Sequence, residues 1–214
     1  MSGNRHIVCY HSPMTRSTGT VVLLEELKAD YELKVLNMKA NEQRGAAYLA
    51  VNPLGKVPAI THNGALITEQ GAIYAYLGDL YPEAGMTPVI GDPLRGPYLR
   101  WLFFYGSAFE PAIGDRMNKI VPLERASPYG SYDAVIKTVT DQLAKGPYIL
   151  GDKKTVADVL WSVAMGWITM FGLVEKTPLI DAYIKRCHSE ANDKVMAMDQ
   201  KLSADHEAAV KAKG

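Results

Sequence analysis

The chain has little cysteine, no excess of charge of either sign and no long apolar run. Its two cysteines, Cys9 and Cys187, lie far apart and lack metal-ligand spacing, which argues against a disulfide framework and favours a reducing cytoplasm. Lys and Arg number 23, as do Asp and Glu, so the basic excess of nucleic-acid or membrane-surface binders is missing. No apolar run approaches the roughly 18 residues of a transmembrane helix, and the N-terminal residues lack a signal-peptide core. We expect a cytoplasmic protein without nucleic-acid, membrane or metal partners.

The first part of the chain alternates between strand and helix patterns. With 48% hydrophobic residues among 214, the chain can form two small domains. Asn63-Gly64 between two short apolar runs indicates a hairpin, because this pair tolerates positive φ. The first two strands, joined by a helix, should be parallel with a right-handed crossover. Strands are expected at 6–11, 31–36, 57–60 and 65–68, and helices or turns at 17–27, 42–51 and 70–80.

The remainder of the chain has helical patterns almost throughout. Pro and Gly cluster in residues 83–96, which we interpret as a linker between a domain at 1–82 and an all-helical domain at 97–214. Thr155-Val156-Ala157-Asp158 has the form of a capping box that opens an apolar helix. Residues 204–214 are polar and rich in Ala and Lys, so we expect this end to fray.

Two segments of the first domain suggest a peptide-like ligand. Val57-Pro58 is a candidate cis peptide in a tight turn, which would leave the backbone N–H and C=O of Val57 facing solvent. Glu69-Gln70 opens a helical pattern, and free N–H groups at a helix N-terminus bind carboxylates. A peptide that ends in a carboxylate would use both features.

The motifs resemble those of the cytosolic glutathione transferases. The resemblance rests on N-P-L-G-K-V-P-A at 52–59, E-Q-x-A-I-x-x-Y-L at 69–77 and T-x-A-D at 155–158, and it extends over about residues 6–189. Ser12-Pro13-Met14-Thr15-Arg16-Ser17 is similar to bacterial and fungal members that carry an S-R-S signature. The resemblance implies a thioredoxin-like α/β domain with a glutathione site, followed by an all-α domain. It also implies a homodimer and an electrophile pocket between the domains.

The resemblance assigns roles in glutathione binding to individual residues. Val57 would pair its backbone with the cysteinyl part, and Pro58 would be the cis proline that exposes it. Glu69 would hold the γ-glutamyl amine and Gln70 its carboxylate, although most relatives carry Ser or Thr at the Gln70 position. The glycyl carboxylate needs a cation or donor, and three residues remain open for it: Lys39, Asn41 and Lys56.

The resemblance implies that the activating group lies at the start of the first helix. Such an enzyme lowers the pKa of the glutathione thiol, which a hydroxyl donor or helix N-terminal N–H groups achieve by hydrogen-bonding the thiolate. Comparison with Ser- or Thr-dependent relatives places Met14 at the catalytic position, and comparison with Cys-dependent relatives places Arg16 there. Comparison with the S-R-S type places Thr15 and Ser17 there. We select Thr15 and Ser17, then Ser12, with Arg16 as a nearby cation; structural N-capping is the alternative role of these hydroxyls.

Aromatic residues of the helical half are candidates for the electrophile site. Tyr105 and Phe109 lie in an aromatic stripe that is mostly core, and we expect them to contact a hydrophobic electrophile. A catalytic Tyr10 is less favoured. The expected activity is that of a glutathione S-transferase in detoxification, either conjugation to an electrophile or reduction of an organic peroxide. The alternatives are a non-catalytic ligand-binding or interaction module, and a regulator of the stringent-starvation type.

Overall fold

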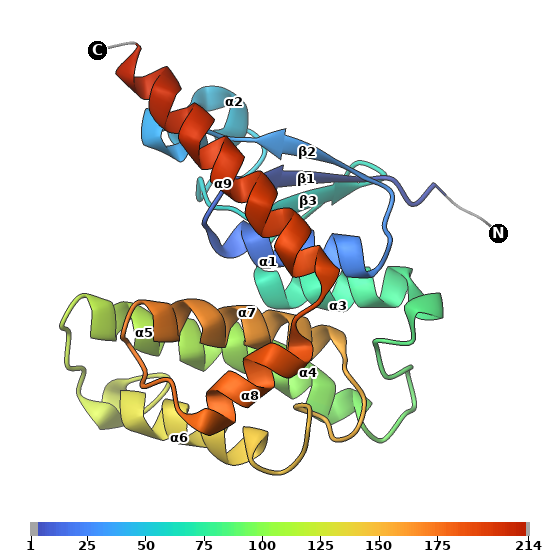
Figure 1. Ribbon diagram of the computed structural model, residues 1–214, viewed down its shortest axis with the longest axis vertical. Helices are drawn as coiled ribbons and strands as arrows, with labels where there is room; N and C mark the ends of the chain where they lie inside the picture. The colour runs from blue at the N-terminus through green and yellow to red at the C-terminus, as the bar shows by residue number, and fades with distance from the viewer. Residues whose placement is uncertain (1–3, 213–214) are drawn as a thin grey trace. The chain divides into compact units, whose positions relative to one another are not determined.

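The computed structural model describes residues 4–212, which form two compact units (Figure 1). One unit contains the described residues up to Tyr81 and again those from Ser189 onward, and the other is Pro82–His188. The expected helical domain at 97–214 therefore differs from the second unit, because the last helix belongs to the first unit.

A four-stranded sheet with the order β2-β1-β3-β4 forms the centre of the first unit. Strand β1 (Ile7–His11) pairs in parallel with β2 (Tyr31–Val35) and antiparallel with β3 (Ala59–His62), which continues through a hairpin into β4 (Ala65–Ile67). Asn63 and Gly64 have φ of 49° and 79° in the hairpin turn. The predicted parallel pair, the hairpin and the thioredoxin-like fold are thus confirmed.

Helices cover both faces of this sheet. Alternate residues of β1 point to opposite faces, so that Ile7, Cys9 and His11 are buried while Tyr10 packs against Tyr48 with ring centroids 5.4 Å apart. Tyr48 belongs to α2 (46–49), which follows the short turns η1 (38–40) and η2 (42–44). Helices α1 (16–26) and α3 (70–80) lie on the other face, as Figure 1 shows.

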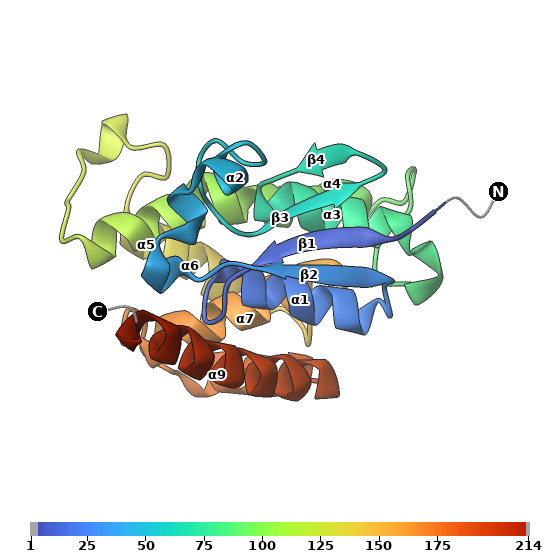
Figure 2. The ribbon, with the colours of Figure 1, turned by 90° about the horizontal axis from the view of Figure 1, so that it is seen from above.

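Helix α9 (Glu190–Lys211) packs along α1 within the first unit, and Figure 2 shows the two side by side. It runs antiparallel to α1: Lys194 Nζ lies 2.6 Å from Glu25 Oε2, whereas Asp199 contacts Thr18 further along. A capping box at Ser189 begins the helix. The expected fraying from residue 204 is therefore wrong as far as Lys211, because the helix docks on the sheet domain.

The second unit is entirely helical in its regular structure, as predicted. Trp161 is at the centre of its core, with ring centroids 5.0 Å from Phe109 and 5.6 Å from both Trp101 and Tyr105. The capping box of Thr155 and Asp158 is present at the start of α7. The elements are η3 (82–84), α4 (95–104), a π-helical turn (105–109), α5 (110–117), η5 (124–126), α6 (132–143), α7 (156–170) and α8 (178–187).

Candidate functional site

The turn between β1 and α1 gathers the three hydroxyl residues selected from the sequence. Thr15 is the N-cap of α1, and its Oγ1 accepts the N–H of Ser17 at 3.2 Å. The same hydroxyl donates to the C=O of Ser12 at 2.7 Å and lies 2.7 Å from Ser17 Oγ. Thr15 is half-buried, whereas Ser12 and Ser17 are buried. Among these three residues, Thr15 therefore has the side chain most open to a ligand.

Ser17 is enclosed and connects its neighbours. Its side chain is fully buried, and its Oγ accepts the N–H of Ser12 at 3.1 Å. The oxygen also lies 2.9 Å from His11 Nδ1 and 3.1 Å from the C=O of Ser12. A hydroxyl on a fully buried side chain is not open to a ligand, which does not fit the direct contact with the thiol expected for Ser17 from the sequence.

His11 and Asp199 also lie at this turn, and neither is among the candidates selected from the sequence. His11 Nε2 lies 2.9 Å from Asp199 Oδ1, and both side chains are fully buried. Asp199 Oδ2 accepts from the Met14 N–H at 2.9 Å and the Thr18 hydroxyl at 2.5 Å. Burial opposes ionisation of Asp199, but the hydrogen bonds from His11, Thr18 and Met14 outweigh it and hold its pKa below the usual value.

A sequence signal for Asp199 existed in the polar C-terminal segment. Val195, Met198 and Leu202 recur at helical spacing, and Asp199 falls within this stripe. A carboxylate on the apolar side of an amphipathic helix needs a partner. The partner itself, His11, lies 188 positions away and could not be read from this pattern.

The Val57–Pro58 peptide bond is cis, which confirms that prediction. Among the described residues, neither backbone group of Val57 forms a hydrogen bond. The preceding C=O of Lys56 accepts from Tyr48 Oη at 2.6 Å and Asn52 Nδ2 at 2.9 Å, which holds the segment in place. The segment thus offers an unused N–H and C=O, while the Lys56 side chain is exposed.

Glu69 and Gln70 lie at the start of α3. Glu69 is the N-cap with φ of 64°, its side chain makes no capping bond, and the residue is exposed. Gln70 is half-buried, and its Nε2 donates to the C=O of Arg16 at 3.2 Å. This bond brings the start of α3 to the start of α1, where the half-buried Arg16 begins the helix.

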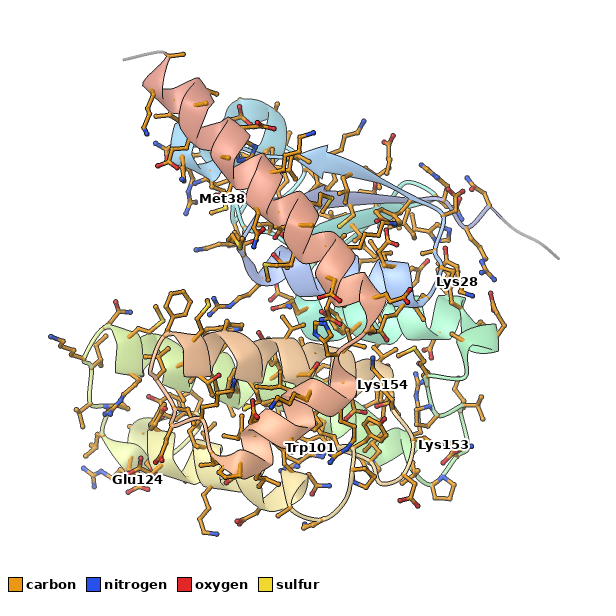
Figure 3. All side chains as sticks on the ribbon, in the orientation of Figure 1. Lys28, Met38, Trp101, Glu124, Lys153 and Lys154 are labelled. Carbon is orange, nitrogen blue, oxygen red and sulfur yellow. The ribbon has the colours of Figure 1, made fainter. Side chains whose placement is uncertain are left out.

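The other two candidates for the glycyl carboxylate lie at η1, where Figure 3 labels Met38. Lys39 and Asn41 are exposed, and Lys39 Nζ lies 3.7 Å from Glu207 Oε2 on α9. Asn37 Nδ2 donates to the C=O of His206 at 3.2 Å, so the end of α9 lies against this turn.

Tyr105 and Phe109 do not form an open surface. They are 3% and 0% exposed, belong to the π-helical turn and pack against Trp161. The Tyr105 hydroxyl donates to Glu110. Their burial in the core of the second unit does not fit the expected contact with an electrophile. The sequence pattern was ambiguous, because aromatic residues at helical spacing are equally typical of a core.

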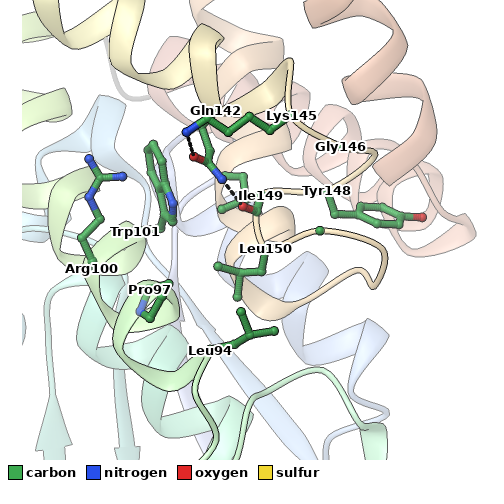
Figure 4. A pocket seen from close by; sticks show the side chains of 11 residues that line it. Leu94, Pro97, Arg100, Trp101, Gln142, Lys145, Gly146, Tyr148, Ile149 and Leu150 are labelled. Carbon is green, nitrogen blue, oxygen red and sulfur yellow. Dashed lines mark hydrogen bonds between the residues drawn. The ribbon is translucent and has the colours of Figure 1, made fainter.

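A cavity of about 570 Å³ lies within the second unit, between α4, α6 and the loop at 146–151 (Figure 4). Trp101 and Leu150 line its apolar side, and Gln142 bridges Lys145 and the C=O of Ile149 at its edge. None of the site residues selected from the sequence lines it.

Within residues 4–212, no cluster of three or more His, Cys, Asp or Glu side chains is arranged to hold a metal ion. Across the same residues, no helix combines the length and hydropathy needed to cross a membrane.

Comparison with known proteins yields consistent matches. Residues 6–79 match the family model described as the N-terminal domain of glutathione S-transferase. The crystal structure of a glutathione transferase from Methylococcus capsulatus is 32% identical with a TM-score of 0.77, covering 91% of this chain and 98% of that one. A sphingomonad glutathione S-transferase, solved in complex with glutathione, is 27% identical with a TM-score of 0.75 over 90% and 98% of the two chains. Glutathione S-transferase PARB of Nicotiana tabacum is 28% identical over 72% of this chain and 78% of its own length.

Proposed function

The chain belongs to the cytosolic glutathione transferase superfamily, and from this membership we propose that it binds glutathione and activates its thiol for attack on a hydrophobic electrophile. The sphingomonad relative bears glutathione in its structure, which supports the same co-substrate here. The second substrate is an electrophilic carbon compound or an organic hydroperoxide.

The proposal is supported by the geometry of the first unit, from which we infer that three kinds of binding group lie near one edge of it. Continuing the β1–β3 register, in which Tyr10 faces Ala59, brings Val57 opposite Ser12. The bond from Gln70 to the C=O of Arg16 brings the start of α3 to the same turn. A free backbone pair, a carboxylate and a hydroxyl are thus available together.

Each group matches one part of glutathione. The N–H and C=O of Val57 pair with the cysteinyl backbone, next to Pro58. The carboxylate of Glu69 accepts the γ-glutamyl ammonium, and the N-terminus of α3 at Gln70 binds the adjacent carboxylate. Lys39, Asn41 and Lys56 are the candidates for the glycyl carboxylate; Lys56 directly precedes Val57.

Thr15 is the proposed catalytic residue. Its hydroxyl, which donates to the C=O of Ser12 in the structure, turns to donate a hydrogen bond to the sulfur of bound glutathione and favours the thiolate, while the thiol proton passes to solvent. In conjugation the thiolate forms a C–S bond as the leaving group departs with its electron pair. Holding both reactants in place supplies further acceleration. Ser12 is the second candidate donor, because its own hydroxyl makes no hydrogen bond among the described residues.

Calorimetric titration with reduced glutathione tests the binding site. The wild-type chain should bind, and Glu69→Ala should weaken binding by about 10-fold or more, because a hydrogen bond to a charged group contributes about 1.5–3 kcal/mol. Glu32→Ala is the matched control. Glu32 is an exposed carboxylate that pairs with Lys34, and it lies toward the end of β2 away from Val35, which pairs with His11 next to the proposed site. Absence of binding by the wild type would favour the non-catalytic module instead.

A pH titration of thiolate absorbance tests the catalytic assignment. Thr15→Ala should raise the pKa of bound glutathione by about one unit or more, since one unit corresponds to 1.36 kcal/mol. An unchanged pKa in Thr15→Ala together with a raised one in Ser12→Ala would transfer the role to Ser12.

We also propose, from family membership, a cytoplasmic homodimer that acts in detoxification. Sedimentation analysis of the full chain tests the dimer, and a monomer at micromolar concentration would contradict it.

A further inference from the structure

A buried chain of hydrogen-bonding groups runs from α9 to the proposed catalytic hydroxyl. Its links are Asp199 Oδ1 to His11 Nε2 at 2.9 Å, His11 Nδ1 to Ser17 Oγ at 2.9 Å, and Ser17 Oγ to Thr15 Oγ1 at 2.7 Å. Asp199, His11 and Ser17 are each fully buried, and Thr15 is half-buried. Only the last member can meet a ligand directly.

The protons available to these hydrogen-bonded groups limit which of them donate and which accept. Asp199 is held as a carboxylate that only accepts, so His11 Nε2 must carry a proton. The other ring nitrogen, Nδ1, then either accepts a hydrogen bond from the Ser17 hydroxyl or, if the ring is an imidazolium, donates one to Ser17 Oγ. Ser17 and Thr15 have one hydroxyl proton each, and the C=O of Ser12 lies within hydrogen-bond distance of both hydroxyls, at 3.1 and 2.7 Å. The state of the His11 ring decides whether Ser17 donates to the ring or to one of the neighbouring oxygens, and thereby which acceptors are left for Thr15. The orientation of the Thr15 hydroxyl is therefore coupled to the buried pair.

The other groups at Asp199 serve to hold it in place. Its second oxygen accepts from the Thr18 hydroxyl of α1 and from the N–H of Met14 in the turn. The neighbouring ion pairs of α9, Lys194 with Glu25 and Lys39 with Glu207, join partly or largely exposed side chains and bond to no member of the chain. Asp199 thus faces the catalytic turn with a fixed geometry.

We propose that Asp199 and His11 are positioning residues for thiol activation: through Ser17 they orient the Thr15 hydroxyl toward the sulfur of bound glutathione. This rests on the proposed function. It assigns a role in the chemistry to α9, which contributes Asp199 to the catalytic turn. The pair does not touch the ligand and acts only through Ser17 and Thr15.

A double-mutant cycle on the thiol pKa of bound glutathione tests the proposal. Thiolate absorbance is titrated with pH in the wild type, Asp199→Asn, Ser17→Ala and the double variant, and glutathione affinity is measured in parallel. Each single variant should raise the thiol pKa by about half a unit or more, a shift of the size that losing a hydrogen bond to a charged group produces. The double variant should shift no further than the larger single one, because both residues act on the same hydroxyl. Glutathione affinity should change less than about threefold.

Lys194→Ala is the control, because it loosens α9 at Glu25 without touching the chain of hydroxyls. It should leave the thiol pKa unchanged. A folded Asp199→Asn with a wild-type thiol pKa, or additive shifts in the double variant, would overturn the proposal and leave Asp199 a structural anchor.

If Asp199→Asn does not fold, His11→Gln carries the same prediction, since its amide can bond Asp199 but cannot reach Ser17 as well. If the wild type does not bind glutathione, the proposed function itself is refuted. If it binds glutathione and the variants leave the thiol pKa unchanged, only the positioning role is refuted.

Discussion

Replacing Asp158 by Ala should unfold the second unit far more readily than breaking the capping box alone. The carboxylate accepts from the N–H and hydroxyl of Thr155 at 2.8 and 2.9 Å, from the N–H of Ile149 at 2.8 Å and from the Tyr183 hydroxyl at 2.9 Å. It therefore fastens the loop before α7 and helix α8, as well as the helix start. Asp158 itself is fully buried.

The expected cost follows from the donors left behind. Asp158→Ala leaves four donor groups on three residues without this acceptor, namely the N–H of Ile149, the N–H and hydroxyl of Thr155 and the hydroxyl of Tyr183, and each such group costs about 1–3 kcal/mol when buried. Burial already raises the pKa of Asp158, and that cost of desolvation is recovered when the charge is removed. We therefore expect a net loss of about 4 kcal/mol. Thr155→Ala removes only the hydroxyl, so the carboxylate keeps three of its four donors, and the variant should lose about 0.5–2 kcal/mol.

Urea unfolding, followed by tryptophan fluorescence and by far-UV circular dichroism, measures both losses. Two probes are needed because the chain has two units that can unfold separately. Asp141→Ala, which removes only an exposed pair with Lys137, should change stability by less than about 1 kcal/mol. An Asp158→Ala variant no less stable than Thr155→Ala would refute the reasoning.

Three further results are expected. The pKa of Asp199 is lowered in the folded state, so its contribution to stability is complete above its unfolded value of about 3.9 and is lost as pH falls through the folded value. The free energy of unfolding of Asp199→Asn, measured against pH in the acid range, should therefore fall less steeply than that of the wild type. Equal slopes would contradict this. Cys9 and Cys187 are buried with pKa raised to about 12, so native protein should resist thiol-alkylating reagents until it unfolds, as mass spectrometry of treated samples can test. Tyr48→Phe removes the 2.6 Å hydrogen bond to the C=O of Lys56, which should lower the free energy of unfolding in denaturant titration by about 0.5–1.5 kcal/mol. The same variant should bind glutathione more weakly, and an unchanged affinity would show that the segment around Val57 and Pro58 is held without this bond.

The features that the sequence predicted correctly depend on short-range chemistry. Asn63-Gly64 forms its hairpin because the pair accepts positive φ, and Thr155 with Asp158 caps α7 because three residues bring the two side chains together. The cis bond before Pro58 was likewise visible in a two-residue pattern. Most helix and strand positions followed from apolar periodicity, and the motifs that carry the family resemblance lie in these same segments.

Tertiary contacts decided the rest. From the sequence, Ser17 and Thr15 are nearly equivalent hydroxyl residues at the start of a helix. Only the fold distinguishes them, because it buries Ser17 fully and leaves Thr15 half-buried. The polar segment from Glu190 to Lys211 is a helix that packs on α1, where Asp199 bonds to His11 and Thr18, residues far away in the sequence. The His11–Asp199 bond joins residues 188 positions apart, and no local pattern specifies such a pair. The pair forms only because α9 packs against α1 in the folded protein.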